Sequence, residues 1–345
     1  MEPTVRTSLL KTGWLLAALL AVVGTGLVGL IVGPVSLGTT AILKELVNLL
    51  PWVDVASGLS DVHAGILIDV RLPRLVLGLL VGATLALSGG SYQGVFRNPL
   101  ASPWLLGVAA GAGLGATIAI VTGSGQFREV LPLAAFAGAL LGVSLTYVMG
   151  YSSSGRTSLT LVLSGIAVSS FLTAGQTFLQ MQHSELLRDV FSWIMGGLTT
   201  ASWREVRLIV PYLIISVVTM LLYARRLDVM SVGDDEAESL GINVARTRLV
   251  VIAAASLGTA AVVAVSGLIG FVGIIVPHAV RQAVGASYRV ILPLSFLFGG
   301  AFLVLTDVLA KTIVSPVELP LGVITAFIGA PFFGLILHRS KSVAP

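Results

Sequence analysis

About ten stretches of mostly apolar residues, each close to twenty residues long, follow one another along this chain. A helix needs about twenty apolar residues to cross the roughly 30 Å hydrocarbon core of a membrane. Only 10% of the residues are charged and the mean hydropathy is +1.00, which indicates a membrane protein. We therefore predict an all-α, polytopic protein that forms one transmembrane domain over residues 1–345. The expected spans are approximately Gly13 to Gly33, Leu72 to Ser91, Trp104 to Val121, Leu131 to Tyr151, Leu159 to Leu179, Val206 to Tyr223, Leu249 to Ser266, Gly270 to Val284, Val290 to Ala310 and Leu319 to Leu337.

An even number of spans places both termini on one side of the membrane. With the N-terminus inside, twelve of the 20 Lys and Arg residues fall in cytoplasmic segments and eight fall outside, which favours cytoplasmic termini. The first stretch is too long for the core of a signal peptide and no small-x-small cleavage motif follows it, so we expect a retained helix. The eighth stretch contains Pro277 and His278, which predicts a short or broken helix packed inside protein.

The longest polar run within the chain is Arg225 to Arg248, RRLDVMSVGDDEAESLGINVARTR. It holds five of the 16 acidic residues. A single Asp or Arg at the centre of a membrane costs about 3 kcal/mol, so this run is expected to be an aqueous, cytoplasmic loop. It would separate the first five spans, approximately 13–182, and the sixth from the last four, approximately 249–338.

The motifs of common enzymes are missing from the sequence. It has no Cys and no HExxH, and its four His residues are dispersed, so neither a metal site nor a catalytic centre is expected. No Lys follows a Gly, which excludes a Walker loop, and we expect no ATP hydrolysis by this chain. The basic residues are scattered, which argues against nucleic-acid binding.

Charged and polar residues within the spans allow two interpretations. Asp307 lies one turn from Lys311, a spacing more typical of a local structural contact than of a proton relay, although an ion-coupled secondary transporter stays an alternative. In the fifth span, polar residues at three- and four-residue spacing share one helix face, which fits either interhelical hydrogen bonds or the wall of a wet pathway. These residues are Ser169, Thr173, Gln176 and Gln180. The outer connection after them contains an amphipathic piece, LLRDVFSWIMGGL, which is either a half-buried surface helix or the rim of a pathway.

The stretch from Arg71 to Gly107, RLPRLVLGLLVGATLALSGGSYQGVFRNPLASPWLLG, resembles the permeases of bacterial ABC importers for iron-siderophores, haem and vitamin B12. These importers form a class with ten helices in each permease. Further similarity lies in GDDEAESLGI, in SGLIGFVGIIVPHAVR, in the helix of Asp307 and in ELPLGVITAFIGAPFF. The resemblance therefore covers nearly the whole chain.

The resemblance implies a permease built from two structurally related halves of opposite orientation. Two permease subunits, in a homodimer or with a paralogue, would enclose a central pathway, and two separate ATPase subunits would hold ATP and Mg; no cofactor is expected on this chain. Short coupling helices in the cytoplasmic loop would sit in a cleft of the ATPase. The residues that match this element are Asp228, Gly233, Asp234, Asp235, Ala237, Glu238, Leu240 and Gly241.

The resemblance also implies contacts on the outer side. Arg71 and Arg74 match basic residues that meet acidic residues of a substrate-binding protein, and Lys311 stands where the family commonly has an arginine. The residues expected along the pathway are Gln93, Ser169, Thr173, Gln176, Gln180 and Trp193, and those expected at an inner gate are Ser153, Ser154 and Thr157.

These patterns together predict a permease subunit of an ATP-binding-cassette importer in the bacterial cytoplasmic membrane. Its expected cargo is an iron chelate, a ferric siderophore or haem, delivered by a periplasmic or lipid-anchored binding protein. A cobalamin permease of the same family is the alternative.

Overall fold

The computed structural model describes residues 10–53, 55–123, 127–151 and 158–341, and within these residues it is helical and contains no strand. Each of the ten expected stretches overlaps one helix, which confirms the prediction of an all-α protein. These helices are α1 (Thr12–Ile31), α4 (Leu72–Phe96), α5 (Val108–Thr122), α6 (Phe127–Tyr151), α7 (Ser158–Gln182), α9 (Trp203–Met230), α11 (Val244–Ser266), α12 (Val272–Val284), α13 (Tyr288–Thr312) and α14 (Leu321–Lys341).

Among the described helices, six are long and apolar enough to cross a membrane by length and composition: α1, α6, α7, α9, α11 and α13. Three shorter apolar segments accompany them, in α5, α12 and α14. The 13 residues of α12 rise only about 20 Å, so the expectation that the eighth stretch is short is confirmed. The third stretch differs from its expected form, because it opens with the 3₁₀ turn η2 (Pro103–Leu106), and Gly107 at φ 81° separates that turn from α5.

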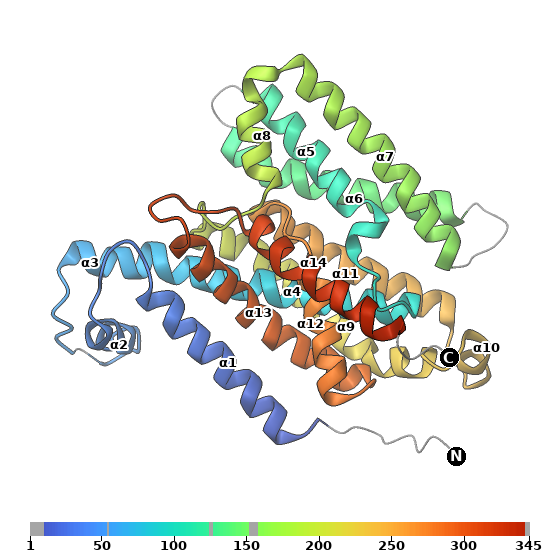
Figure 1. Ribbon diagram of the computed structural model, residues 1–345, viewed down its shortest axis with the longest axis horizontal. Coiled ribbons are helices and arrows are strands. Elements are labelled where there is room, and N and C mark those ends of the chain that lie inside the picture. The colour runs from blue at the N-terminus through green and yellow to red at the C-terminus, as the bar shows by residue number, and fades with distance from the viewer. Residues whose placement is uncertain (1–9, 54, 124–126, 152–157, 342–345) are drawn as a thin grey trace.

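The short helices gather at the two ends of the long ones (Figure 1). One end carries α2 (Thr39–Val47) and α3 (Asp61–Gly65), and the opposite end carries α10 (Asp234–Ser239). α3 continues through the π-helical segment η1 (Ile66–Arg71) into α4, so the chain is helical without a break from Asp61 to Phe96. The remaining short elements, η3 (Ser184–Leu186) and α8 (Leu187–Ile194), follow α7.

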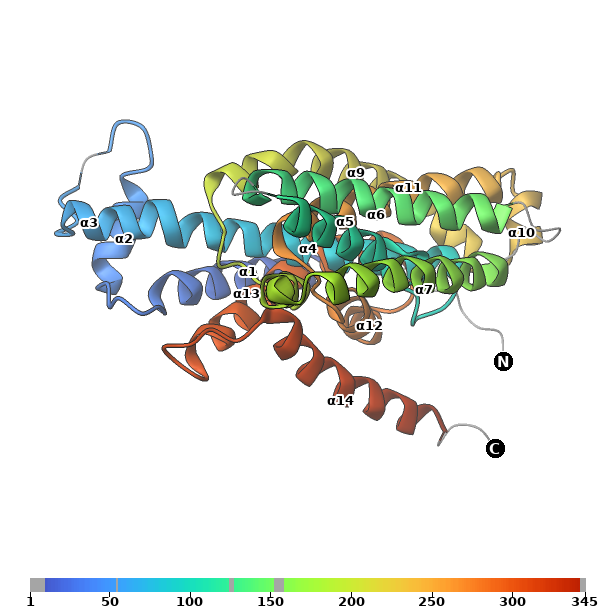
Figure 2. The same cartoon turned by 90° about the horizontal axis from the view of Figure 1, so that it is seen from above.

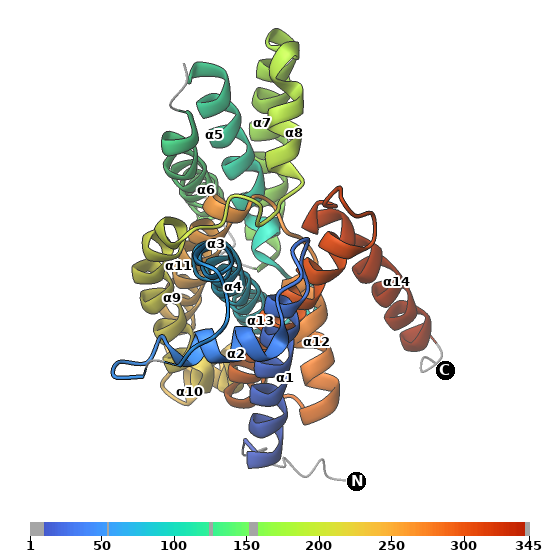
Figure 3. The ribbon, with the colours of Figure 1, turned by 90° about the vertical axis from the view of Figure 1, so that its left-hand side faces the viewer.

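The long buried helix α4 is the centre of the packing. Figure 3 shows it from the end that carries α2 and α3, with α9 and α11 on one side, α12 and α13 on the other, and α5 to α8 as a separate group. α4 contacts α9, α11, α12 and α13. The contact with α13 is close at Gly82 and Gly299, where a Cβ on either glycine would collide with the backbone carbonyl of the other. Small residues thus bring two backbones together as is typical of helices packed in lipid.

α14 stands apart from this bundle. Figure 2 shows it projecting away from α13 and α12, the helices that it contacts. Its separation leaves an open space on one side of the bundle, whose lining is described below.

The cytoplasmic loop expected over residues 225–248 is shorter than predicted. α9 continues through Arg225, Arg226 and Asp228 to Met230, and α11 begins at Val244. Charged residues exclude a segment from hydrocarbon but do not end a helix, so both helices extend into water. Only residues 231–243 connect them, and α10 lies within this connection.

Candidate functional site

The first candidate site is the acidic turn around α10. Ala237 is fully buried and packs with Met230 and Val244, which fixes α10 against α9 and α11. The turn ends at Gly241, whose φ of 81° favours glycine, and the Ile242 backbone N–H donates to the Ala237 carbonyl at 3.0 Å. The sequence therefore builds a rigid helical turn in which Ala237 is the anchor and Gly241 the cap.

The outer face of this turn is acidic with apolar edges. Asp235, Glu236 and Glu238 are exposed, and Val232 and Leu240 on either side are among the most exposed large apolar side chains of the described residues. Exposed apolar side chains beside charges of one sign are a feature of protein contact surfaces. We call these five residues the α10 face.

Two of the acidic residues predicted for coupling make internal contacts instead of belonging to this face. Asp228 accepts hydrogen bonds from the backbone N–H of Tyr288 and, at 2.9 Å, from the Ser287 hydroxyl, and so caps the N-terminus of α13. Asp234 forms ion pairs with Arg248 at 3.1 Å and with Arg97 at 3.3 Å. These contacts connect the α10 region to α13, α11 and the end of α4.

The second candidate site is a cluster of charges at the opposite end of α4 and α13. The Arg74 guanidinium lies 2.8 Å from a carboxylate oxygen of Asp307 and 2.8 Å from one of Glu318. Lys311 reaches the other Asp307 oxygen at 2.8 Å, so the expected local contact within α13 is present. The side chains of Arg74 and Asp307 are 15% and 7% exposed. The cluster thus ties the start of α4, the end of α13 and the segment before α14 to one another.

Arg71 lies nearby but binds different partners. Its guanidinium donates to the carbonyl of Leu30 at 2.6 Å and to the carbonyls of Ile31 and Val35. These carbonyls belong to the end of α1 and the residues after it, where no helical N–H is available. Burial lowers the pKa of Arg71, but an arginine stays charged at neutral pH. The binding-protein contact predicted for Arg71, Arg74 and Lys311 stays a prediction, and the described structure uses all three in internal contacts.

A polar cavity of about 640 Å³ begins at the charge cluster. Arg74, Asp307 and Glu318 form one part of its wall, and Trp193 and Arg204 contribute to another. Trp193, which the sequence placed on a pathway, therefore lines a cavity. The wall brings together residues from α4, α9, α13 and the segment after α8.

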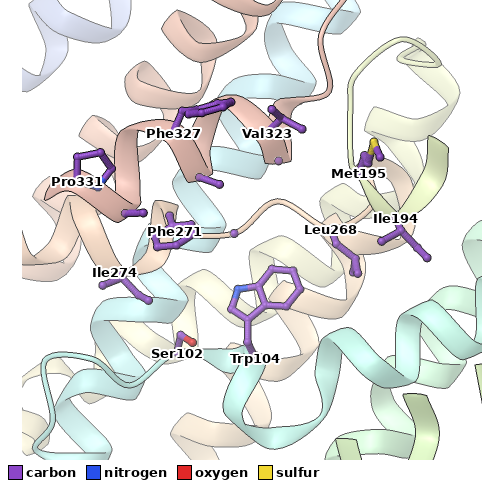
Figure 4. Close-up of a pocket in the computed structure, with 14 residues that line it drawn as sticks. Ser102, Trp104, Ile194, Met195, Leu268, Phe271, Ile274, Val323, Phe327 and Pro331 are labelled. Atoms are coloured by element: carbon purple, nitrogen blue, oxygen red, sulfur yellow. The ribbon is translucent and has the colours of Figure 1, made fainter. Parts of the chain in front are cut away.

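A second, apolar cleft of about 890 Å³ lies beside α14 (Figure 4). Trp104 and Leu268 face it from one side and Phe327 from α14 on the other. Phe271, which precedes α12, also lines it and has an unusual positive φ of 65°. The cleft is the space that the separated α14 leaves open.

A junction of three backbone segments stands between the cavity and the cleft. Gly322 donates to the Met195 carbonyl and Leu321 to the Gly196 carbonyl, both at 3.0 Å, and Gly197 donates to the Ser266 carbonyl at 2.8 Å. Gly196, Ser266 and Leu321 face the polar cavity, whereas Met195 and Gly322 face the apolar cleft. We call residues 195–197, 266–268 and 321–322 the glycine junction. The glycine junction was not predicted from the sequence, although the glycines of GGL, SGL and PLG were a usable signal.

The other predicted pathway residues lie at helix contacts or on the surface. Gln93 is buried, and it donates to the Gly273 carbonyl at 3.2 Å and accepts from Arg281 at 3.4 Å. Gln176 is buried against Gly113 of α5, as expected for an interhelical contact. Ser169 and Gln180 are half-buried and Thr173 is exposed. Their pathway role stays a prediction.

Two expectations concern features outside these cavities. The inner-gate residues Ser153, Ser154 and Thr157 lie outside the described residues. Within the described residues, no group of three or more His, Cys, Asp or Glu could hold a metal ion.

Residues 17–339 match the sequence model of the FecCD transport family. The cobalamin import system permease protein BtuC of Halobacterium salinarum is 44% identical over 286 residues, which cover 83% of this chain and 76% of that protein. The Fe(3+)-citrate import system permease protein YfmE of Bacillus subtilis is 38% identical and covers 81% of this chain and 84% of that protein. A solved structure of an ABC transporter assigned to the metal-chelate type, in an inward-facing conformation, is 32% identical with a TM-score of 0.83. It covers 95% of this chain and 100% of that one.

Proposed function

Because this chain belongs to the FecCD transport family, we propose that it is the membrane permease subunit of an ATP-driven importer for a metal chelate. The family match over residues 17–339 carries the proposal, and the likeness of the fold to an ABC transporter over 95% of the chain supports it. The proposed cargo is a ferric siderophore or haem, with cobalamin as the alternative. The relatives import cobalamin and ferric citrate, which are both metals held in organic ligands.

The chain works with an ATPase at its cytoplasmic end. The α10 face, with exposed Asp235 and Glu238 and the apolar side chain of Leu240, supports this end as the ATPase contact. Asp234 of α10 forms ion pairs with Arg97, after α4, and with Arg248 of α11, and Asp228 caps α13. A displacement of α10 by the ATPase therefore moves α4, α11 and α13 with it. ATP and Mg belong to the ATPase, two copies of which serve two permease subunits.

The opposite end receives the cargo from a binding protein. The exposure of Arg74 to the polar cavity supports its docking role, whereas the bonds of Arg71 to α1 carbonyls support a structural one. Both termini are cytoplasmic, which fits the direction of α1 and α14: α1 begins and α14 ends toward the α10 end of the molecule (Figure 1). The chain forms one permease domain over residues 1–345 in the cytoplasmic membrane.

The glycine junction is the closed barrier of the pathway in this conformation. It has the polar cavity on its outer side and the apolar cleft on the other, and backbone hydrogen bonds, each of modest net strength, connect its three segments. A shift of α14 breaks the bonds of Leu321 and Gly322 at once. Such a barrier opens when one helix moves and closes again without a change in side-chain pairing.

The experiment is uptake into proteoliposomes that contain the purified chain and its cognate ATPase, with the cognate binding protein outside. Ferric siderophore, haem and cobalamin are offered separately, with and without enclosed ATP. ATP-dependent uptake of one of them is the expected result. Uptake that needs an ion gradient and no ATPase would support the secondary transporter instead. The contacts of Asp307 do not favour that alternative, because its two carboxylate oxygens pair with Arg74 and Lys311 within the protein.

A further inference from the structure

The connection between α1 and α4 presents an apolar tip that no described part of the chain covers. Leu49, Leu50 and Pro51 are exposed, and the Trp52 side chain is 100% exposed. Residues 49–53 contain no charged side chain. Four consecutive exposed apolar residues, one of them a fully exposed tryptophan, are unusual on a surface that faces only water.

The loop is held in the shape that displays this tip. The Asn48 side chain donates to the Val55 carbonyl at 3.0 Å and accepts from the Val55 N–H at 2.8 Å, which closes the base of the loop. The Lys44 amine adds a contact with the Ala56 carbonyl at 3.4 Å. Trp52 has a φ of 78°, a left-handed conformation that is rare for a bulky residue.

The helix that leads into the loop lies across the spanning helices. Figure 1 shows α2 nearly end-on beside the outer end of α1, whereas Figure 3 shows it lengthwise. α2 buries Ile42 and exposes Leu43 and Val47. This orientation, across the spanning helices and just beyond the end of α1, is the one that interfacial helices adopt.

The loop projects on the same side of the molecule as the largely uncovered, apolar helix α9. In Figure 3 it projects on the side of α9 and away from α14. α9 and α1 meet the criteria for membrane spans and have most of their surface uncovered, with apolar side chains such as Leu20 and Leu222 exposed. The polar cavity proposed for cargo delivery is lined by other elements, with Trp193 and Glu318 in its wall.

We propose that residues 49–53 are an interfacial membrane anchor, in which Leu49, Leu50 and Trp52 insert into the headgroup region of the outer leaflet. Tryptophan favours this region because its ring is apolar and its N–H finds a polar partner there. Backbone donors within the anchor are paired inside the loop, because the N–H groups of Leu49, Leu50 and Val53 donate to the carbonyls of Leu46, Val47 and Leu50, which lowers the cost of insertion. The anchor fixes α2 and the outer end of α1 at the membrane surface. The anchor requires that α1 and α9 span a membrane, and its assignment to the outer leaflet rests on the orientation in the proposed function; it does not depend on the cargo.

The chain contains no cysteine, so single-cysteine variants report one position each. Leu50→Cys is labelled with a nitroxide in the full-length protein, in vesicles of phosphatidylethanolamine and phosphatidylglycerol. Two accessibilities of the nitroxide are measured, one to oxygen, which concentrates in lipid, and one to a water-soluble nickel chelate. Their quotient is the oxygen-to-nickel ratio. Leu20→Cys on α1 is the lipid-facing control and Leu240→Cys beside α10 the aqueous control; these positions are 70% and 71% exposed.

The expected oxygen-to-nickel ratio at Leu50 is several-fold above that at Leu240 and close to that at Leu20. Adding Trp52→Ser to Leu50→Cys lowers the ratio, because the main anchoring side chain is lost. A ratio at Leu50 equal to that at Leu240 overturns the proposal. The proposal also fails if Leu50 is water-exposed in vesicles and becomes protected only when a binding protein is added, since the tip is then a protein contact.

Discussion

Replacement of Arg74 by Met removes the cation at the centre of the outer charge cluster while keeping an apolar side chain of similar length. Arg74 pairs with Asp307 and Glu318, and its side chain is 15% exposed. Loss of one partner from a fully buried ion pair costs about 3–5 kcal/mol. The expected loss of stability is smaller, about 2–3 kcal/mol, because Lys311 still neutralises Asp307 at 2.8 Å and Glu318 is 30% exposed.

The assay is reversible unfolding in mixed detergent micelles, followed by circular dichroism. Arg204→Met is the matched control, because Arg204 is an exposed arginine near the same end of the chain, and its expected change is within about 0.5 kcal/mol. Arg74→Lys is expected between the two, since lysine keeps the charge and loses the two-pronged geometry. If Arg74→Met costs no more stability than Arg204→Met, the cluster does not hold the outer ends of α4 and α13 together.

Three further predictions use the same unfolding assay with matched controls. Asp228→Ala is expected to lower the free energy of unfolding by about 1–2 kcal/mol because α13 loses its cap. Asp235→Ala on the α10 face is expected to change it by no more than about 0.5 kcal/mol. Equal losses would contradict the division between internal and surface acidic residues. Gly82→Val should lower the free energy of unfolding by about 3 kcal/mol or more, because the new side chain meets the α13 backbone. The side chain of Gly24→Val enters open space, so its loss should be less than about 1 kcal/mol. A tolerated Gly82→Val would mean that α4 and α13 do not pack closely. Gly267→Ala is strained at a φ of 67° and its methyl group meets the Trp193 carbonyl, so it should lower the stability by about 1–3 kcal/mol and slow uptake. Gly24→Ala on α1 enters open space and should leave uptake unchanged. Normal uptake by Gly267→Ala would refute the barrier role of the glycine junction.

The spans could be predicted from sequence because hydrocarbon imposes a local rule. Each crossing helix must satisfy its own backbone and expose apolar side chains, so length and hydropathy reveal it without knowledge of its neighbours. The end of a helix outside the membrane obeys no such rule. That is why α9 was expected to stop near Tyr223 and instead continues to Met230.

The partners of the charged residues could not be predicted, because they depend on tertiary packing. Arg74 and Asp307 are 233 residues apart in sequence, and nothing local in either segment indicates the other. Only the pair Asp307 and Lys311, one turn apart, was visible as a pattern. The glycine junction was missed for the same reason, since its three segments meet only after the helices have packed.

The most direct test of the account is whether the α10 face couples this chain to an ATPase. ATP-dependent uptake is measured in proteoliposomes while purified ATPase is titrated onto wild-type chain and onto a variant with Asp235→Lys and Glu238→Lys, two exposed residues. The expected results are no uptake without ATPase and saturable uptake with it. The variant is expected to need at least a tenfold higher ATPase concentration for the same uptake, although it unfolds like the wild type. Equal ATPase requirements for both chains, or uptake by the wild type without any ATPase, would contradict the account.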